Sequence, residues 1–110
     1  QAFAGLESQG QIRRPCLVAA GQHNAHMYYL LMNSLAERTA FISAMKDQDI
    51  NCVFHYVPLH SAPYGLKAGR AVGDLPLTAD LSDRLVRLPL WVGLEDQQSR
   101  VIDNVLNILK

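Results

Sequence analysis

Aromatic and aliphatic residues gather in two short runs that predict β-strands. Residues 25–32 are rich in such side chains and indicate a buried strand. A second strand is expected over residues 51–57, where Val53 and Phe54 supply β-branched and aromatic side chains. Pro58 ends this second strand, because proline cannot donate a hydrogen bond to a neighbouring strand.

Apolar residues at helical spacing predict a helix between these two strands. Ser34 and Glu37 have the spacing of a capping box, in which the serine accepts from the third helical amide and the glutamate reaches back. The helix is expected to cover residues 35–48. Its buried stripe should comprise Leu35, Ile42 and Met45, with Phe41 at the edge.

A short helix with two arginines is expected in the second half of the chain. Thr78 is a suitable N-cap, and the helix should end at Arg87. Arg84 and Arg87 flank this end, where they form either a solvated face or a contact with an anion. The sequence leaves both interpretations open.

The last thirty residues predict an extended segment followed by a long helix. The chain should be extended from Arg87 to Trp91, with Trp91 in the core. Pro89 would limit any strand here to the edge of a sheet. A broad apolar face and two acidic residues in the first turn predict the final helix over residues 95–110.

Glycine and proline mark where the remaining segments turn. The first ten residues have the pattern of the last turns of a helix that Gly10 ends, as in the tail of a longer polypeptide. Residues 59–77 contain several glycines and prolines and predict a loop, and loops of this length are typically functional. The order of the elements indicates an α+β fold with helices packed on a small sheet.

Composition narrows the class of protein without giving its function. The chain has 110 residues, of which 49% are hydrophobic and 18% charged, as in a globular domain. Ten basic residues balance ten acidic ones, so no broad field attracts nucleic acid, and no apolar run reaches the roughly 18 residues that span a bilayer. Cys16 and Cys52 make no disulfide framework, which indicates a reduced, cytoplasmic protein.

Candidate chemistry lies at the end of the second strand. Two histidines, two tyrosines and two prolines occur between His55 and Tyr64, a mixture that suits a strand delivering imidazoles and phenols into a cleft. Pro58 fixes the backbone, so we expect Leu59 to anchor the turn in the core and His60 to face the cleft. For His55, a hydrogen-bonded place in the core is the alternative.

The spacing of the histidines suggests a metal site as an alternative, but the other residues argue against it. His55 and His60 could bind zinc with help from His23 and His26. No cysteine or carboxylate completes a set of four ligands at the usual spacing, so we do not expect a metal.

Four segments carry a resemblance to a known family. They are Asn24-Ala25-His26-Met27-Tyr28, the helix over residues 35–50, His55-Tyr56-Val57-Pro58-Leu59-His60 and Arg87-Leu88-Pro89-Leu90-Trp91. In order, and over nearly the whole chain, they resemble the DegT-type sugar-nucleotide aminotransferases. The His-Tyr-x-Pro-Leu-His string is specific for this family, and the Asn-Ala-His-Met segment narrows the likeness to the branch that aminates dTDP-4-keto-6-deoxyhexoses. One departure is Leu94-Glu95, where relatives often have Leu-Ser as the helix cap.

The resemblance implies the C-terminal small domain of a fold-type-I, pyridoxal-phosphate enzyme. Such a domain is α+β, with a small, mostly antiparallel sheet and helices packed on one face. Residues 1–24 would be the end of a helix from the large domain plus a linker, and residues 25–110 the small domain. The large domain of such enzymes binds pyridoxal 5'-phosphate, and Lys46, Lys67 and Lys110 match no lysine motif of the family.

The resemblance also implies a reaction and its partners. The intact enzyme, a homodimer, would transfer an amino group from L-glutamate to a dTDP-4-keto-6-deoxyhexose, giving a dTDP-4-amino-4,6-dideoxyhexose for the synthesis of surface polysaccharide such as lipopolysaccharide. His55, Tyr56 and His60 would line the substrate pocket, where a neutral imidazole donates to a sugar oxygen and a protonated one meets a diphosphate. These 110 residues alone would be inactive, and neither nucleic acid nor a membrane would be a partner.

A stand-alone ferredoxin-like interaction module is the alternative from another class of protein. It would use the open face of its sheet to dimerise or to bind a regulator, and it would catalyse no reaction. An upstream large domain with a Schiff-base lysine in the same reading frame favours the transaminase, whereas a start codon near Gln1 favours the module.

Overall fold

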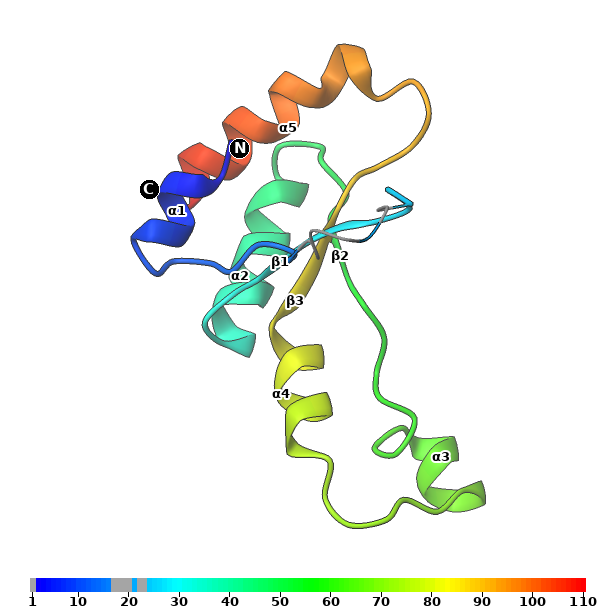
Figure 1. Ribbon diagram of the computed structural model, residues 1–110. Coiled ribbons are helices and arrows are strands. Elements are labelled where there is room, and N and C mark those ends of the chain that lie inside the picture. Colours follow the sequence, from blue (N-terminus) through cyan, green and yellow to red (C-terminus); the bar gives the residue numbers. More distant parts are fainter. Residues whose placement is uncertain (1, 17–20, 22–23) are drawn as a thin grey trace.

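The computed structural model describes residues 2–16, 21 and 24–110, which form an α+β fold (Figure 1). Its helices are α1 (Ala4–Ser8), α2 (Leu35–Lys46), α3 (Pro63–Ala68), α4 (Pro76–Arg84) and α5 (Glu95–Ile108). Its strands are β1 (Tyr28–Leu31), β2 (Val53–Phe54) and β3 (Leu85–Leu88). The predicted fold class is confirmed.

The sheet is antiparallel and has the strand order β1-β3-β2, so β3 lies in the centre. Leu30 of β1 pairs with Val86 of β3, and Phe54 of β2 pairs with the same residue from the other side. Alternate residues of a strand point to opposite faces. Leu30 and Val86 are fully buried in one cluster with residues of α2 and α5, so these helices pack on one face of the sheet.

The central position of β3 corrects two predictions. The helix expected to run to Arg87 ends at Arg84, and it begins with Pro76 in its first turn rather than after Thr78. The strand beside Pro89 was expected at an edge, yet it is paired on both sides. Hydrogen bonds to two neighbouring strands favour the extended backbone over a further turn of helix, and Pro89 follows the strand without interrupting its ladder.

The segment from β2 to α4 also differs from its prediction. The strand expected over residues 51–57 is only the two residues of β2. Because β3 begins at Leu85, directly after α4, the chain beyond His55 has no extended partner. The loop expected over residues 59–77 contains the helix α3, which begins with Pro63, a position where the missing N–H of proline costs no helical hydrogen bond.

α2 starts as its capping signal predicts. The N–H of Glu37 donates to the hydroxyl oxygen of Ser34 at 3.1 Å. The carboxylate of Glu37 reaches back one residue further than a standard capping box, where it accepts from the backbone N–H of Asn33 at 3.2 Å. The start of the helix is therefore fixed by the local sequence.

The side of α2 that meets the sheet differs from the predicted stripe. Phe41 was placed at the edge of the stripe and is 2% exposed, whereas Leu35 was placed within it and is 45% exposed. Phe41 and Met45, four residues apart on one side of the helix, join the core cluster instead. A broad apolar stripe does not by itself say which of its edges meets the sheet.

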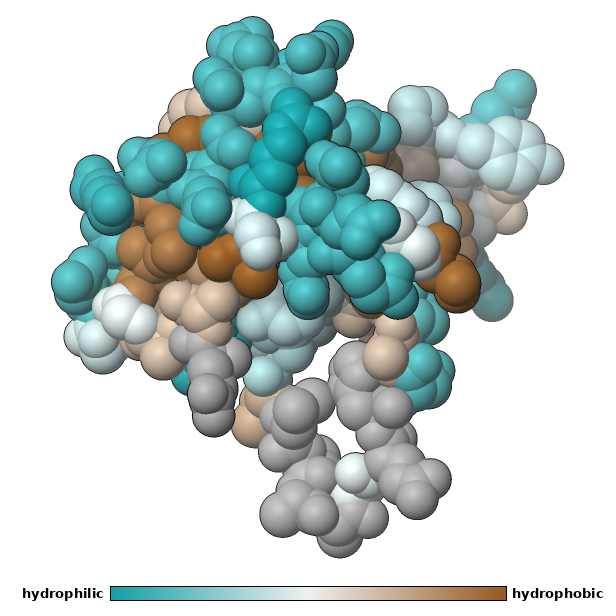
Figure 2. Space-filling view, turned by 90° about the horizontal axis from the view of Figure 1, so that it is seen from above, coloured by the Kyte–Doolittle hydropathy of each residue, from teal (hydrophilic) through white to brown (hydrophobic). Residues whose placement is uncertain are grey.

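The connection between β3 and α5 holds another departure. Trp91 was expected in the core and is 55% exposed, because it lies in this loop beyond the end of the sheet. α5 itself begins at Glu95 as predicted and buries Val101 and Val105. Seen from above, where α5 is nearest, the outer surface is largely hydrophilic, with apolar side chains visible between the polar ones (Figure 2).

The N-terminal helix α1 is part of the same core. Phe3 and Leu6 are buried in the core cluster, and Gly10 ends the helix with a positive φ of 73°, as its place in the sequence predicts. Arg14 donates to the carboxylate of Glu7 from its backbone N–H at 2.8 Å and from Nε at 2.7 Å. These contacts, the backbone hydrogen bond above all, lower the pKa of Glu7.

The segment between β2 and α4, which we call the arm, projects from the body of the molecule (Figure 1). The radius of gyration is 15.6 Å, against roughly 13 Å for a compact domain of this length. Within the arm, Leu59 is 84% exposed and so does not anchor the turn in the core as predicted. The carbonyl of Pro58 accepts from Ser61 and Ala62, which closes a tight turn that leaves Leu59 outside.

Phe41 should be a much larger source of stability than Leu35. Phe41→Ala removes a fully buried ring and should lower the free energy of unfolding by about 3–5 kcal/mol. Leu35→Ala removes a side chain that is nearly half exposed and should cost less than about 1 kcal/mol. Urea unfolding of both variants checks this difference, and equal losses would contradict the observed orientation of α2.

The contact between Glu7 and Arg14 should make stability depend on pH. Because folding lowers the pKa of Glu7 below its ordinary value of 4.5, this carboxylate stabilises the fold above that value and ceases to do so as the pH falls through the folded pKa. Glu7→Gln should therefore lower the melting temperature at pH 7 and have little effect in strong acid. In an Arg14→Gln background the effect at pH 7 should shrink; an undiminished effect would refute the pairing.

Candidate functional site

A groove of about 440 Å³ opens where β1 and β2 begin and β3 ends. We call it the sheet-end groove. Its walls are His26 and Met27 before β1, Asn51 and Val53 at the start of β2, His55 and Tyr56 after it, and Arg87, Leu88, Pro89 and Leu90 at the end of β3. No carboxylate is among these residues. The lining is mixed, with apolar walls and a few polar groups, as in many ligand sites.

Two of the three predicted site residues meet in this groove. The rings of His55 and Tyr56 lie edge to face, with their centroids 4.8 Å apart. Nδ1 of His55 is shielded from solvent and has no hydrogen-bond partner among the described residues. The hydroxyl of Ser82 in α4 donates to the backbone carbonyl of Tyr56 at 2.6 Å, which fixes the chain where β2 gives way to the arm.

The two arginines considered together in the sequence have different surroundings. Arg84 forms an ion pair with Asp80 at 2.6 Å and donates to the carbonyl of Met32 at 3.4 Å, so its charge is neutralised within the fold. The guanidinium carbon of Arg87 lies 5.5 Å from the ring centre of Tyr56, and this side chain lines the groove. Only Arg87 is therefore placed to meet a ligand there.

The third predicted residue, His60, lies elsewhere. It is half-buried and lines a separate groove of about 760 Å³ in the arm, between the turn at Pro58 and α3. Gly65 of α3 permits this arrangement, because a Cβ at this position would collide with the backbone of Leu59. His55 and Tyr56 thus line the sheet-end groove, whereas His60 lines the groove in the arm.

His26 is a groove residue that the sequence suggested only as a metal ligand. Its Nδ1 lies 2.7 Å from the side-chain oxygen of Asn24. Both residues belong to the Asn-Ala-His-Met segment, which was therefore the sequence signal that could have indicated His26 as a groove residue. In the part of the chain that the structure describes, no group of three or more His, Cys, Asp or Glu could hold a metal ion. His23, the remaining histidine of that hypothesis, lies outside the described residues.

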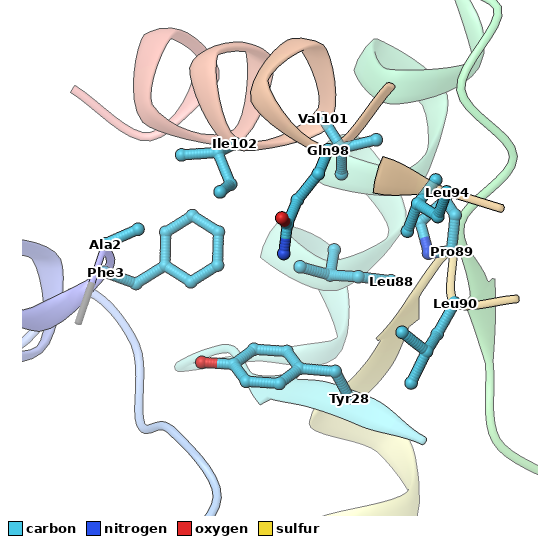
Figure 3. A pocket seen from close by; sticks show the side chains of 10 residues that line it. All are labelled: Ala2, Phe3, Tyr28, Leu88, Pro89, Leu90, Leu94, Gln98, Val101 and Ile102. Atoms are coloured by element: carbon cyan, nitrogen blue, oxygen red, sulfur yellow. The ribbon is translucent and has the colours of Figure 1, made fainter. Parts of the chain in front are cut away.

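A smaller, mainly apolar pocket of about 190 Å³ lies between α1, α5 and the sheet (Figure 3). The ring of Phe3 faces that of Tyr28, with centroids 6.1 Å apart, and the amide of Gln98 points between them and Leu88. Burial raises the pKa of the Tyr28 hydroxyl. None of the predicted site residues lines this pocket.

The described residues do not fit a site for pyridoxal phosphate. Lys46 lies in the last turn of α2, Lys67 in that of α3, and Nζ of Lys110 donates to Asn107 at 3.4 Å. All three lysines are exposed, and none of them lines any of the grooves described above. No step through this cofactor can therefore be derived from these residues.

Comparison with known proteins identifies the family of this chain and agrees with its fold. The DegT/DnrJ/EryC1/StrS aminotransferase family matches residues 1–106. The chain belongs to this family. The uncharacterized protein MJ1066 of Methanocaldococcus jannaschii is 36% identical over 93 residues, which are 81% of this chain and 23% of that protein.

Three solved structures share the fold. The aminotransferase TlmJ from Streptoalloteichus hindustanus superposes with a TM-score of 0.80 at 24% identity, and DesV from S. venezuelae with 0.83 at 23%. The putative sugar aminotransferase Spr1654 from Streptococcus pneumoniae, solved in its PMP form, gives 0.82 at 21%. The matches cover 98% of this chain for TlmJ, 99% for DesV and 98% for Spr1654. This chain spans only 29% of TlmJ, 29% of DesV and 27% of Spr1654.

The surroundings of the lysines generate a prediction for this DegT-family chain. Incubation of the 110 residues with pyridoxal phosphate, followed by borohydride reduction, should give no stoichiometric adduct, because no lysine lines any of the three grooves described above. Mass spectrometry of the intact and digested chain measures this. Full modification of one specific lysine would overturn the prediction, whereas trace labelling of all three is the background expected of exposed amines.

Proposed function

We propose that this chain is the C-terminal small domain of a pyridoxal-phosphate aminotransferase that acts on a nucleotide sugar. The enzyme takes an amino group from L-glutamate and delivers it to a dTDP-4-keto-6-deoxyhexose, giving a dTDP-4-amino-4,6-dideoxyhexose for surface polysaccharide. The observation that carries the proposal is the sheet-end groove, in which the family's His-Tyr pair, His55 and Tyr56, lies beside Arg87. The family match over residues 1–106 and the fold of the sugar aminotransferases support it.

In this proposal the cofactor is held outside these residues, by a large domain of the same polypeptide. Residues 1–24 are the end of a helix from that domain and a linker, and residues 25–110 are the small domain, into whose core Phe3 and Leu6 pack. Pyridoxal phosphate, when bound there, supplies the group that carries nitrogen between the two substrates. The enzyme works in the cytoplasm as a homodimer. Among the described residues, no helix has both the length and the apolar character needed to cross a bilayer.

The small domain contributes recognition of the sugar nucleotide. His55 is half-buried, and its ring makes no hydrogen bond to the described residues. Because Nδ1 is shielded, Nε2 is the nitrogen that would meet a polar group of a ligand, without first breaking an internal hydrogen bond. The hydroxyl of Tyr56, which is largely exposed, can donate to or accept from a sugar oxygen. His60, from the groove in the arm, is proposed to contact another part of the same substrate.

The complete polypeptide encoded by the reading frame that contains this chain tests the function. Incubated with pyridoxal phosphate, L-glutamate and a panel of dTDP-keto-sugars, it should aminate a 4-keto-6-deoxyhexose. His55→Ala or His60→Ala should each remove a hydrogen bond worth about 1.5–3 kcal/mol if the partner is charged, and so lower kcat/KM for the keto-sugar roughly ten- to hundred-fold. The half-reaction with glutamate should change much less.

Stopped-flow spectra separate the two half-reactions. If a histidine variant slows both of them equally, that histidine stabilises the domain and does not recognise the sugar. If it slows neither, it takes no part in recognition. A complete polypeptide without a large domain, or one that aminates no member of the panel, refutes the proposed function and favours an interaction module.

A further inference from the structure

We propose that Arg87 is the anion-binding residue of the sheet-end groove and that its ligand is the diphosphate of a nucleotide-linked substrate. This inference rests on the proposed function for the kind of substrate. It adds a specificity-determining residue to His55 and Tyr56, and it assigns that residue to a different part of the substrate from the sugar.

No carboxylate of the described residues forms an ion pair with Arg87. The described residues form two ion pairs, Arg14 with Glu7 and Arg84 with Asp80, and Arg87 takes part in neither. Arg87 is nonetheless only partly exposed on the central strand of the sheet. A partly buried cation without a counter-ion costs free energy, and a bound anion offsets that cost.

The hydrogen-bonding capacity of Arg87 is also largely unused. A guanidinium has five N–H donors. Among the described residues, its one hydrogen bond is a long one, from Nη2 to the carbonyl of Phe54 at 3.5 Å, and its Nε is shielded from solvent without a partner. Its cross-strand neighbours are Tyr29 and Val53, neither of which carries a negative charge. The N–H groups of Nη1 and the second N–H of Nη2 therefore remain available to a ligand.

A second residue of the groove points to the same kind of ligand. Nδ1 of His55 is shielded and unpartnered, as is Nε of Arg38, Arg84 and Arg87. Of these four side chains, His55 and Arg87 line the groove, together with His26 and Asn51. No Asp or Glu is among the lining residues. The ring of Tyr56, 5.5 Å from the guanidinium carbon, holds Arg87 by a cation–π contact, which orients the fork before a ligand arrives. A planar guanidinium matches two phosphate oxygens at once.

The composition of the groove favours a diphosphate over an amino acid. The ammonium group of free L-glutamate finds no carboxylate among the lining residues and would lie near a guanidinium of the same charge. A diphosphate brings only negative charge and can meet the guanidinium and an imidazole together. The volume of about 440 Å³ is within the range of ligand pockets, roughly 300–1,000 Å³.

Direct binding to the complete polypeptide tests the inference without relying on catalysis. Isothermal titration with dTDP and with thymidine, which lacks phosphate, should show that Arg87→Gln weakens dTDP binding about ten- to hundred-fold and leaves thymidine binding unchanged. Arg87→Lys keeps the charge but loses the fork, so it should weaken dTDP binding several-fold. Arg38→Gln is the matched control, because Arg38 makes a similar contact, 5.1 Å above the ring of Phe54, but does not line the groove.

Each outcome decides the question. Unchanged dTDP binding by Arg87→Gln, or equal losses for dTDP and thymidine, overturns the inference, as does a wild-type protein that does not bind dTDP. If circular dichroism shows that Arg87→Gln does not fold, the affinity of Arg87→Lys for dTDP tests the inference instead, and an unchanged affinity overturns it. Tighter binding of L-glutamate than of dTDP through Arg87 would also overturn it. If Arg87 binds dTDP but no keto-sugar is aminated, the proposed function fails and the anion site stands.

Discussion

The central strand β3 exchanges backbone hydrogen bonds with β1 on one side and β2 on the other. Val86 lies between Leu30 and Phe54, its partners across the ladder, and it is fully buried because α2 and α5 pack on its face of the sheet. The same pairing ends α4 at Arg84 and limits β2 to two residues. The chain must therefore leave the sheet after Phe54, and this exit forms one wall of the groove and the start of the arm.

Successive side chains of β3 point to opposite faces of the sheet, so the core residues lie on one face and Arg87 on the other. Val86 and Leu88 point to the helices and join the core, whereas Arg87 between them lies on the opposite face. Three residues earlier, Arg84 is the last residue of α4 and pairs with Asp80 in the preceding turn. Two arginines that the sequence could not tell apart thus differ in charge balance, and the one on the strand carries our inference about anion binding.

Membership of the aminotransferase family changes how the arm and the lysines are interpreted. The arm is extended and has large exposed apolar side chains such as Leu59, Tyr64 and Leu66. The chain spans less than a third of the solved relatives, and its lysines lie away from the grooves. Both observations are consistent with our proposal, in which the small domain recognises the substrate beside a separate domain that holds the cofactor. In that proposal the groove supplies hydrogen bonds and charge, and the cofactor carries the nitrogen.

Local sequence was sufficient for the features that depend on neighbouring residues. The capping serine Ser34 fixed the start of α2, Gly10 the end of α1, and the apolar face with its acidic first turn the final helix, since each of these signals acts within a few residues. The α+β class, the family and the grouping of His55 with Tyr56 were also predictable. Patterns could not give the strand pairing, since β3 is held by residues more than thirty positions away. For that reason only the tertiary structure decided that β3 is central, that Phe41 rather than Leu35 is buried, that His60 lies apart, and that Arg87 faces a groove without an acid.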